Sequence, residues 1–95
     1  MSDQPTLEID KDDTKWWWLN NKFHREDGPA VEFLNGGKMW YLNGIRHRED
    51  GPAIERSDGA KIWLLNGIQY DFDEWLDENT TLSDEEKIMI KLIYG

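Results

Sequence analysis

The chain has 95 residues, no cysteine, six tryptophans and a formal net charge of −9 at pH 7. This length suits a single compact domain, and the lack of cysteine excludes disulfides and thiolate metal sites. The excess of carboxylates disfavours binding to nucleic acid or to an anionic membrane, because both are negatively charged. The first residues lack a secretory pattern, and no apolar run approaches the roughly 20 residues of a membrane-spanning helix, so we expect a cytoplasmic protein.

Charge is distributed unevenly along the chain. Residues 1–14 contain five acids and predict an acidic N-terminal tail, whereas acids and bases nearly balance in residues 15–70. Residues 71–95 again carry an excess of acids, eight against two lysines. We therefore expect a single domain in which a neutral central region is followed by an acidic helical hairpin.

A repeat organises the central region. The segment HREDGPA occurs at residues 24–30 and again, 23 positions later, at residues 47–53. We call these two segments joint 1 and joint 2. The same period places Trp17, Trp40 and Trp63 in one column, so a repeat starts near each of them. Repeats of this length are usually one supersecondary unit stacked on its neighbours.

Turn residues identify the repeated unit as a β-hairpin. The Asn-Gly pairs at 43–44 and 66–67 favour tight hairpin turns, in which both central residues have positive φ, and an Asn-Asn pair occupies the equivalent position 20–21. The Asp-Gly-Pro of each joint belongs at strand ends, because proline cannot donate to a ladder. The sequence therefore predicts an antiparallel β-meander of about six or seven short strands between residues 16 and 70.

Both faces of this sheet are predicted to be apolar. Side chains of a strand alternate between its faces. One face carries Trp17, Trp40 and Trp63, each followed two residues later by a leucine on the same face. The other receives Trp16, Trp18, Met39, Tyr41, Ile62 and Leu64. An antiparallel sheet with one face in water alternates apolar and polar residues, so we expect each face of this sheet to be covered.

Two short helices are predicted after residue 70. Asp71 is followed three residues later by an acid, and Ser83 opens a full capping box. The first helix has an apolar stripe of Phe72, Trp75 and Leu76. The second has an apolar face of Ile88, Met89, Leu92 and Ile93, with Lys87 and Lys91 on its polar side. We expect both helices to pack on one sheet face, which gives an α+β fold.

The pattern W-x-L-N-G-x-x-H-R-E-D-G-P-A-x-E resembles the tryptophan-rich HRxDGPA repeats of small proteins from tailed bacteriophages, some bacteria and large viruses. The match covers roughly residues 16–70. The pattern is also similar to the MORN repeat, although the Tyr-Gly-x-Trp opening of that repeat is absent. The resemblance implies a β-meander and a phage origin, and it implies no catalytic residues.

The polar residues of the joints have two interpretations. Arginine and histidine can hold a phosphate, and this interpretation predicts a ligand-binding cluster of His24, Arg25, Arg46, His47 and Arg48. In the structural interpretation, Asp-Gly-Pro forms a turn, arginine and glutamate pair with charges of the next repeat, and histidine packs against a tryptophan column. We favour the structural interpretation, because a binding site rarely needs its turn residues repeated with its polar groups.

Catalysis, a cofactor and a metal are not expected. The two histidines occupy equivalent repeat positions, and the serines and threonines lie in the N-terminal tail, turns and caps rather than beside a histidine. Surplus aromatic rings and acids instead favour protein binding, because tryptophan and tyrosine are enriched at binding hot spots. The predicted partner-binding residues are Trp16, Trp18, Tyr41, Asp73, Glu74, Asp77, Glu78, Asp84 and Glu85.

These features predict a non-catalytic protein-binding module. With the phage resemblance, we expect an inhibitor of a host protein involved in defence or nucleic-acid handling, located in the host cytoplasm. It would act by steric block or by acidic mimicry of DNA on a partner with a basic surface. One alternative is an oligomer that sequesters a nucleotide-like signal molecule. Another is a homodimeric structural or scaffold protein whose apolar faces meet.

Overall fold

The structure, a computed structural model, describes residues 4–95, so residues 1–3 of the predicted N-terminal tail lie outside the described residues. The strands are β1 (Thr6–Ile9), β2 (Lys15–Leu19), β3 (Lys22–Phe23), β4 (Val31–Glu32), β5 (Lys38–Met39), β6 (Tyr41–Leu42), β7 (Ile45–Arg46), β8 (Ile54–Glu55), β9 (Lys61–Leu65) and β10 (Ile68–Tyr70). The helices are α1 (Phe72–Glu78) and α2 (Asp84–Tyr94). The predicted α+β fold is confirmed.

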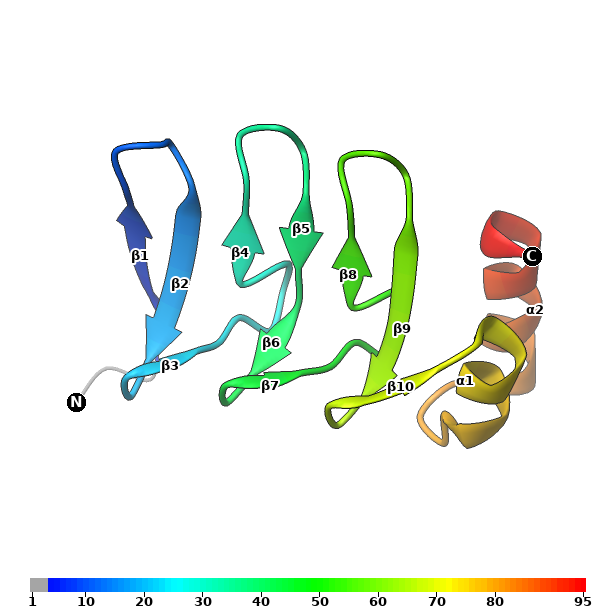
Figure 1. The fold of residues 1–95 in the computed structure, drawn as a ribbon. Coiled ribbons are helices and arrows are strands. Elements are labelled where there is room, and N and C mark those ends of the chain that lie inside the picture. The colour runs from blue at the N-terminus through cyan, green and yellow to red at the C-terminus, as the bar shows by residue number, and fades with distance from the viewer. Residues whose placement is uncertain (1–3) are drawn as a thin grey trace.

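The sheet is an antiparallel array of three hairpins that lie side by side, β1–β2, β4–β5 and β8–β9 (Figure 1). The main sheet has the order β1-β2-β4-β5-β8-β9-β10, β3 pairs with β2, and β6 and β7 form a separate two-stranded ladder. Residues 15–70 contain nine short strands, against the six or seven predicted between residues 16 and 70. Part of the reason is that β5 and β6, which continue one another along the chain, pair with different neighbours.

The predicted turns adopt the conformation that their residues favour. Asn43 and Gly44 have φ values of 52° and 79°, and the pair at 66–67 has 51° and 81°. The Asn-Asn pair at 20–21 does the same with 52° and 64°. Asparagine tolerates this left-handed region better than most residues and glycine adopts it freely. Each turn joins the longer hairpin of its repeat to a short return strand.

Residues 1–14 were predicted to form a tail, but residues 6–9 form the strand β1. Leu7 pairs with Trp17 and Glu8 pairs with Trp16 in the β1–β2 register. The pair at 8–9 lies 23 residues before β4, so the repeat period extends further towards the N-terminus than the HREDGPA motif indicates. β1 therefore supplies the first strand of the first hairpin. It is also an edge strand of the described sheet.

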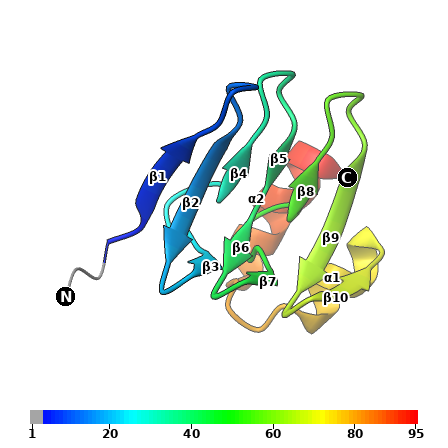
Figure 2. The ribbon, with the colours of Figure 1, turned by 60° about the vertical axis from the view of Figure 1, so that its left-hand side comes forward.

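The helices cover one face of the last repeat. Figures 1 and 2 place α1 and α2 at the β9–β10 end of the array and on one side of the sheet. The core there consists of Trp63, Leu65, Trp75, Leu76 and Ile90. The predicted stripe of α1 is thus confirmed. Both helices begin as predicted, with complete capping boxes at Asp71 and Ser83.

A second, smaller cluster lies on the opposite face of the sheet. It contains Ala30, Val31 and Tyr41, with Trp16, Phe23 and Met39 packed around them. Tyr41 is buried, and its hydroxyl accepts a hydrogen bond from Arg46 Nε at 3.1 Å. Tyr41 is one of the predicted partner-binding residues, and only 8% of it is accessible. None of the helices in residues 4–95 is long and apolar enough to cross a membrane.

The orientation of α2 overturns the prediction for its packing face. Ile90 is buried and Tyr94 packs against the core, whereas Ile88, Met89, Leu92 and Ile93 are 59, 57, 76 and 65% exposed. The helix carries apolar residues around most of its circumference, so the sequence pattern does not decide which side meets the sheet. Ile90 and Tyr94 are four residues apart and share one side of the helix, and that side faces Trp63.

Candidate functional site

The two histidines connect consecutive repeats. His24 Nδ1 accepts a hydrogen bond from the backbone N–H of Asn43 at 2.9 Å, and His47 Nδ1 accepts the equivalent bond from Asn66 at 2.8 Å. Both imidazoles are buried. Because Nδ1 accepts, the neutral ring carries its proton on Nε2. In joint 2 this nitrogen lies 3.0 Å from a carboxylate oxygen of Glu49, and in joint 1 the Glu26 carboxylate lies 3.6 Å away.

The arginine of each joint lies over the tryptophan of its own repeat. Arg48 Cζ is 3.8 Å from the centre of the Trp40 ring, and Arg25 Cζ is 4.0 Å from that of Trp17. Both guanidinium groups also bond within the chain. Arg48 donates from Nε to Asp50 at 2.9 Å and from Nη1 to the carbonyl of Pro52 at 3.0 Å. A guanidinium held over an indole face gains a cation–π attraction.

The glycine of each joint leaves room for that guanidinium. A Cβ atom added at Gly51 would lie 2.6 Å from Arg48 Cζ, and one at Gly28 would lie 2.9 Å from Arg25 Cζ. Both distances are too short for a side chain to be accommodated without movement. The spacing of arginine and glycine, which is the same in both copies of HREDGPA, is thus explained by packing. The motif forms a structural joint, as the sequence favoured, although its arginine contacts its own repeat.

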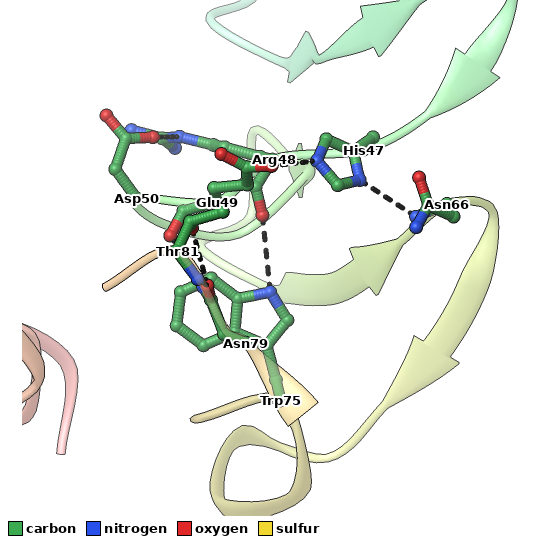
Figure 3. A network of polar contacts seen from close by, with 8 residues as sticks. All are labelled: His47, Arg48, Glu49, Asp50, Asn66, Trp75, Asn79 and Thr81. Atoms are coloured by element: carbon green, nitrogen blue, oxygen red, sulfur yellow. Dashed lines mark hydrogen bonds and ion pairs between the residues drawn. The ribbon is translucent and has the colours of Figure 1, made fainter. Parts of the chain in front are cut away.

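Helix α1 replaces the joint in the third repeat. Trp63 is covered by Trp75 and Phe72, each with its ring centre 4.7 Å away. Trp75 Nε1 donates to the carbonyl of Arg48 at 3.3 Å, and Asn79 Nδ2 donates to that of Glu49 at 2.7 Å. Figure 3 shows this network, which fastens α1 and the following loop to joint 2.

A groove lies between the two joints and the segment that links the helices. Its volume is about 640 Å³, within the range of small-molecule sites. Trp40, Leu42 and Leu82 supply apolar surface in it. Five of its lining side chains are carboxylates, against two guanidinium groups; the carboxylates are Glu26, Asp27, Glu49, Asp50 and Glu86. The groove is therefore net negative with an aromatic wall.

The rim carboxylates are accessible and charged. The side chains of Glu26, Asp27 and Asp50 are mostly exposed. Glu86 closes the capping box of α2, where hydrogen bonds from the backbone N–H and the side chain of Ser83 hold the pKa of its carboxyl below the usual range. Glu86 therefore stays ionised at neutral pH. Hydrogen bonds to the charged form of a carboxyl favour that form.

The predicted ligand-binding cluster is not assembled at one place. Arg25, His47 and Arg48 line the groove, whereas His24 and Arg46 do not. Arg46 lies on the β6–β7 ladder and bonds to Tyr41. Because Nε and Nη1 of both joint arginines already bond to carboxylates and carbonyls, these side chains are poorly placed to clamp a phosphate.

The tryptophans predicted to bind a partner are held on the face opposite α1. Trp16 Nε1 donates to Asp10 at 3.0 Å, and Trp18 Nε1 donates to Glu8 at 3.0 Å. Both indoles are half-buried and pack against Phe23: the Trp16 ring stacks on it with the ring centres 5.1 Å apart, and the Trp18 ring is tilted against it with the ring centres 4.3 Å apart. The hydrogen bond from Trp16 is the main cause that lowers the pKa of the Asp10 carboxyl below its ordinary value of 3.8.

The predicted acidic partner-binding residues all lie exposed on the two helices. They are Asp73, Glu74, Asp77, Glu78, Asp84 and Glu85. The groove residues Trp40, Leu42, Leu82 and Glu49 were not among the predicted partner-binding residues. Trp40 and Glu49 could be identified in the sequence as repeat positions. Leu82 reaches the groove only because α1 docks on joint 2, and the sequence pattern does not predict this docking.

Comparisons with protein-family models, with curated proteins and with solved structures find no match to this chain. Within residues 4–95, histidine and acidic side chains do not gather in groups of three or more that could hold a metal ion. The groove brings an aromatic side chain and accessible carboxylates together.

Proposed function

We propose that this protein is a non-catalytic binding module that holds a basic segment of a partner protein in the groove beside Trp40. The observation that carries this proposal is the combination of an aromatic and aliphatic wall with a rim of five carboxylates. Lysine and arginine side chains have apolar stems and charged ends. The stems would lie along Trp40, Leu42 and Leu82, and the charged ends would reach the rim.

Charge favours a protein partner over a nucleotide. The joint arginines, which a phosphate would need, are neutralised by aspartates about 3 Å away, and the surrounding rim repels an anion. This weakens the proposal of a sponge for nucleotide-like signals. An acidic groove also raises the rate at which a basic partner is captured, because complementary potentials steer association.

A binding role fits the state of the histidines better than catalysis does. Each imidazole uses Nδ1 to accept a backbone N–H of the next repeat, and each lies in a different joint. A histidine occupied in this way is not available at Nδ1 as a general base. We therefore propose steric occlusion of a partner as the mechanism, in line with the inhibitor of a host protein that the sequence predicts.

Acidic mimicry of DNA is the version of this proposal in which the helices bind the partner. It would use the exposed carboxylates of α1 and α2 in place of phosphates. The exposed side of α2, however, is aliphatic around Leu92, which is unlike a phosphate backbone. The groove and the helices therefore make different predictions about which carboxylates matter.

A peptide titration separates the two versions. The probe is a short lysine- and arginine-rich peptide with one leucine, titrated at low and moderate salt, with a glutamate-rich peptide of the same length as control. Replacing Glu26 and Glu49 by glutamine should weaken binding of the basic peptide by about fivefold or more, because charge-assisted contacts at a partly desolvated site are stronger than exposed ones.

The matched control replaces Asp73 and Asp77 by asparagine, which removes the same charge outside the groove. Its affinity should change less than about twofold, because neither side chain lines the groove and both are exposed to screening by salt. If both pairs of substitutions weakened peptide binding equally, the groove would not be the binding site. The peptide would then be attracted only non-specifically by the net charge. Weakening by the control pair alone would favour the helices and hence mimicry.

A further inference from the structure

The first hairpin of the array has a neighbouring hairpin on one side only. β4 pairs with β5 of its own hairpin and with β2 of the preceding one, and β8 pairs in the same way with β9 and β5. β1 holds the corresponding place in the first hairpin, but among residues 4–95 it pairs with β2 alone. Figures 1 and 2 show β1 at the end of the array away from the helices. Its outer side is therefore an unpaired strand edge, to which another chain can add a strand.

The backbone groups on this edge belong to Leu7 and Ile9. The N–H of Asp10 donates to the carbonyl of Thr14 at 3.1 Å, so Asp10 is a hydrogen-bonded position of the β1–β2 ladder. Such positions alternate along an antiparallel pair, so the N–H and C=O groups of Glu8 also point towards β2, whereas those of Leu7 and Ile9 point outwards. The two residues are 47 and 55% exposed. Donors and acceptors thus stand along the edge within reach of another strand.

The later hairpins show what bonds to the position of Leu7. Ala30 and Ala53 correspond to Leu7 at intervals of 23 residues, and the carbonyl of each accepts the N–H of a tryptophan from the preceding hairpin. Trp17 donates to Ala30 at 2.8 Å, and Trp40 donates to Ala53 at 2.7 Å. The carbonyl of Leu7 is therefore the place for an N–H of an added strand.

The position of Ile9 is used in the same way. It corresponds to Glu32 and Glu55 in the later hairpins, which pair with Lys15 and Lys38 of the preceding strands. Both outward residues of β1 thus stand at positions through which the later hairpins receive a neighbouring strand. Because these internal pairings are antiparallel, the repeat defines both the direction and the register in which a strand would add to β1.

We propose that the outer edge of β1 binds an extended, basic segment of a partner protein as an additional antiparallel strand. The segment alternates apolar and basic residues, with apolar side chains opposite Leu7 and Ile9 and basic ones opposite Glu8 and Asp10. This alternation follows because successive side chains of a strand point to opposite faces and meet their cross-strand neighbours there. Backbone hydrogen bonds supply affinity and the alternation supplies selectivity, as in other cases of strand addition.

The charge around the edge selects a basic segment. Residues 8–13 contain four acids and one lysine, and Glu8, Asp12 and Asp13 are exposed. Because the added strand is antiparallel, its N-terminal part lies beside these acids. The repeat itself places lysine there, since Lys15 and Lys38 begin the strands that occupy this place in the two internal pairings. Opposite charges on neighbouring strands stabilise the pairing.

A second copy of this chain fits the edge poorly. The register that uses both outward residues of each chain sets Leu7 opposite Ile9, and it therefore sets Glu8 of one chain opposite Glu8 of the other. Like charges directly opposite each other destabilise a strand pair. A head-to-tail contact would need the far end of the array, which the helices occupy (Figure 1). The occupant that fits is a different, basic chain.

This inference does not rest on the proposed function, because residues 6–10 do not line the groove. Both sites take a basic ligand, so the experiment has to report where a peptide binds. Hydrogen exchange of single backbone amides does this, since it distinguishes the edge of β1 from the groove.

The first test measures amide exchange with the capped peptide Lys-Val-Lys-Val-Thr, which has the proposed alternation. In the free chain the amides of Leu7 and Ile9 should exchange fast and that of Glu8 slowly, because only Glu8 donates to β2. At a peptide concentration about ten times the dissociation constant, exchange at Leu7 and Ile9 should slow by about tenfold. The control is the same peptide with both valines N-methylated, which keeps the charges but removes the N–H groups that face β1. It should give no protection.

A peptide that leaves exchange at Leu7 and Ile9 unchanged up to millimolar concentration overturns the proposal, as does equal protection by the N-methylated peptide. A peptide that binds without protecting β1 would overturn the edge and leave the groove as its site. In the reverse case, Glu26→Gln together with Glu49→Gln should leave the protection of Leu7 and Ile9 unchanged. Loss of protection in that variant would assign the peptide to the groove.

The second test changes the edge itself. Ile9→Pro removes an outward N–H and no bond to β2, and proline is tolerated on an edge strand when the lost N–H faces solvent. It should weaken peptide binding by about tenfold or more, whereas Ile9→Val keeps the N–H and should change binding by less than about twofold. Slow exchange at Glu8 checks that β1 still pairs with β2, and the N-methylated peptide decides the question if it does not.

Normal peptide binding by an Ile9→Pro chain in which β1 still pairs with β2 would refute strand addition. Sedimentation velocity of the chain without peptide tests the remaining occupant. Self-association that Ile9→Pro abolishes would assign the edge to a second copy and contradict the proposal.

Discussion

Replacing Arg48 by alanine tests whether HREDGPA is a structural joint. The guanidinium of Arg48 lies 3.8 Å from the Trp40 ring centre, donates to Asp50 and to the carbonyl of Pro52, and approaches Glu55 within 3.3 Å. Only 16% of the side chain is exposed. Arg25 makes the equivalent contacts in joint 1, but its side chain is 23% exposed and its joint lies nearer the open end of the array.

The cost of Arg48→Ala follows from these contacts. Loss of the cation–π contact costs about 0.5–2 kcal/mol at a partly desolvated site. The carbonyl of the buried Pro52 loses its donor from Arg48, which costs about 1–3 kcal/mol if no water replaces it. The ion pair with exposed Asp50 adds less than about 1 kcal/mol. Together these give about 1.5–6 kcal/mol, a substantial part of the 5–15 kcal/mol by which domains are typically stable.

Urea unfolding at pH 7, followed by tryptophan fluorescence and circular dichroism, measures this loss as the change in the free energy of unfolding. Arg25→Ala is the matched comparison and should cost about 1 kcal/mol less, because its contacts are longer and more exposed. An Arg48→Ala protein that loses less than about 1 kcal/mol, or that loses nucleotide binding at unchanged stability, would refute the structural interpretation.

Three further changes probe single contacts. Gly51→Ala should destabilise the fold by about 1–3 kcal/mol in thermal or urea unfolding, because a Cβ atom 2.6 Å from Arg48 Cζ displaces the guanidinium from Trp40; an unchanged stability would contradict the close packing. Asn79→Ala should cost about 2–3 kcal/mol, since the buried Asn79 amide is the donor to the carbonyl of Glu49, whereas the exposed neighbour change Thr80→Ala should cost less than about 0.5 kcal/mol. The folded-state pKa of Asp10 is lowered, so its contribution to stability is present at neutral pH and is lost as the pH falls below the ordinary value of 3.8 and through the folded-state pKa. The stability difference between wild type and Asp10→Asn should therefore shrink between pH 7 and about pH 3; a difference that does not change with pH would show that Asp10 does not act through its charge.

Most of the fold could be predicted because its signals are local. The Asn-Gly turns require positive φ, and the structure has it at Asn43 and Asn66. Both capping boxes form where the sequence places them. The strand β1 was missed because residues 6–9 share the repeat period but not the HREDGPA letters, and an edge strand with exposed side chains leaves a weak apolar pattern.

The candidate site could be predicted only in part. The polar residues of the joints were identified, and the preference for a structural role agrees with their contacts. Stacking of Arg48 on Trp40 joins positions eight residues apart across a strand, a turn and a return strand, so no local spacing indicates it. The groove additionally needs Leu82, which reaches it only because α1 docks on joint 2.

The sequence by itself determined the 23-residue period, the hairpins, the helix starts and the excess of acids at the ends, because each follows from backbone preferences or from composition. Tertiary structure decided which side of α2 is buried, because the helix has apolar residues on two sides. The side with Ile90 and Tyr94 is the one that packs against Trp63 and its neighbours. Tertiary structure also decided that the joint arginines serve packing, because a guanidinium binds whichever ring and carboxylates the folded chain brings within reach.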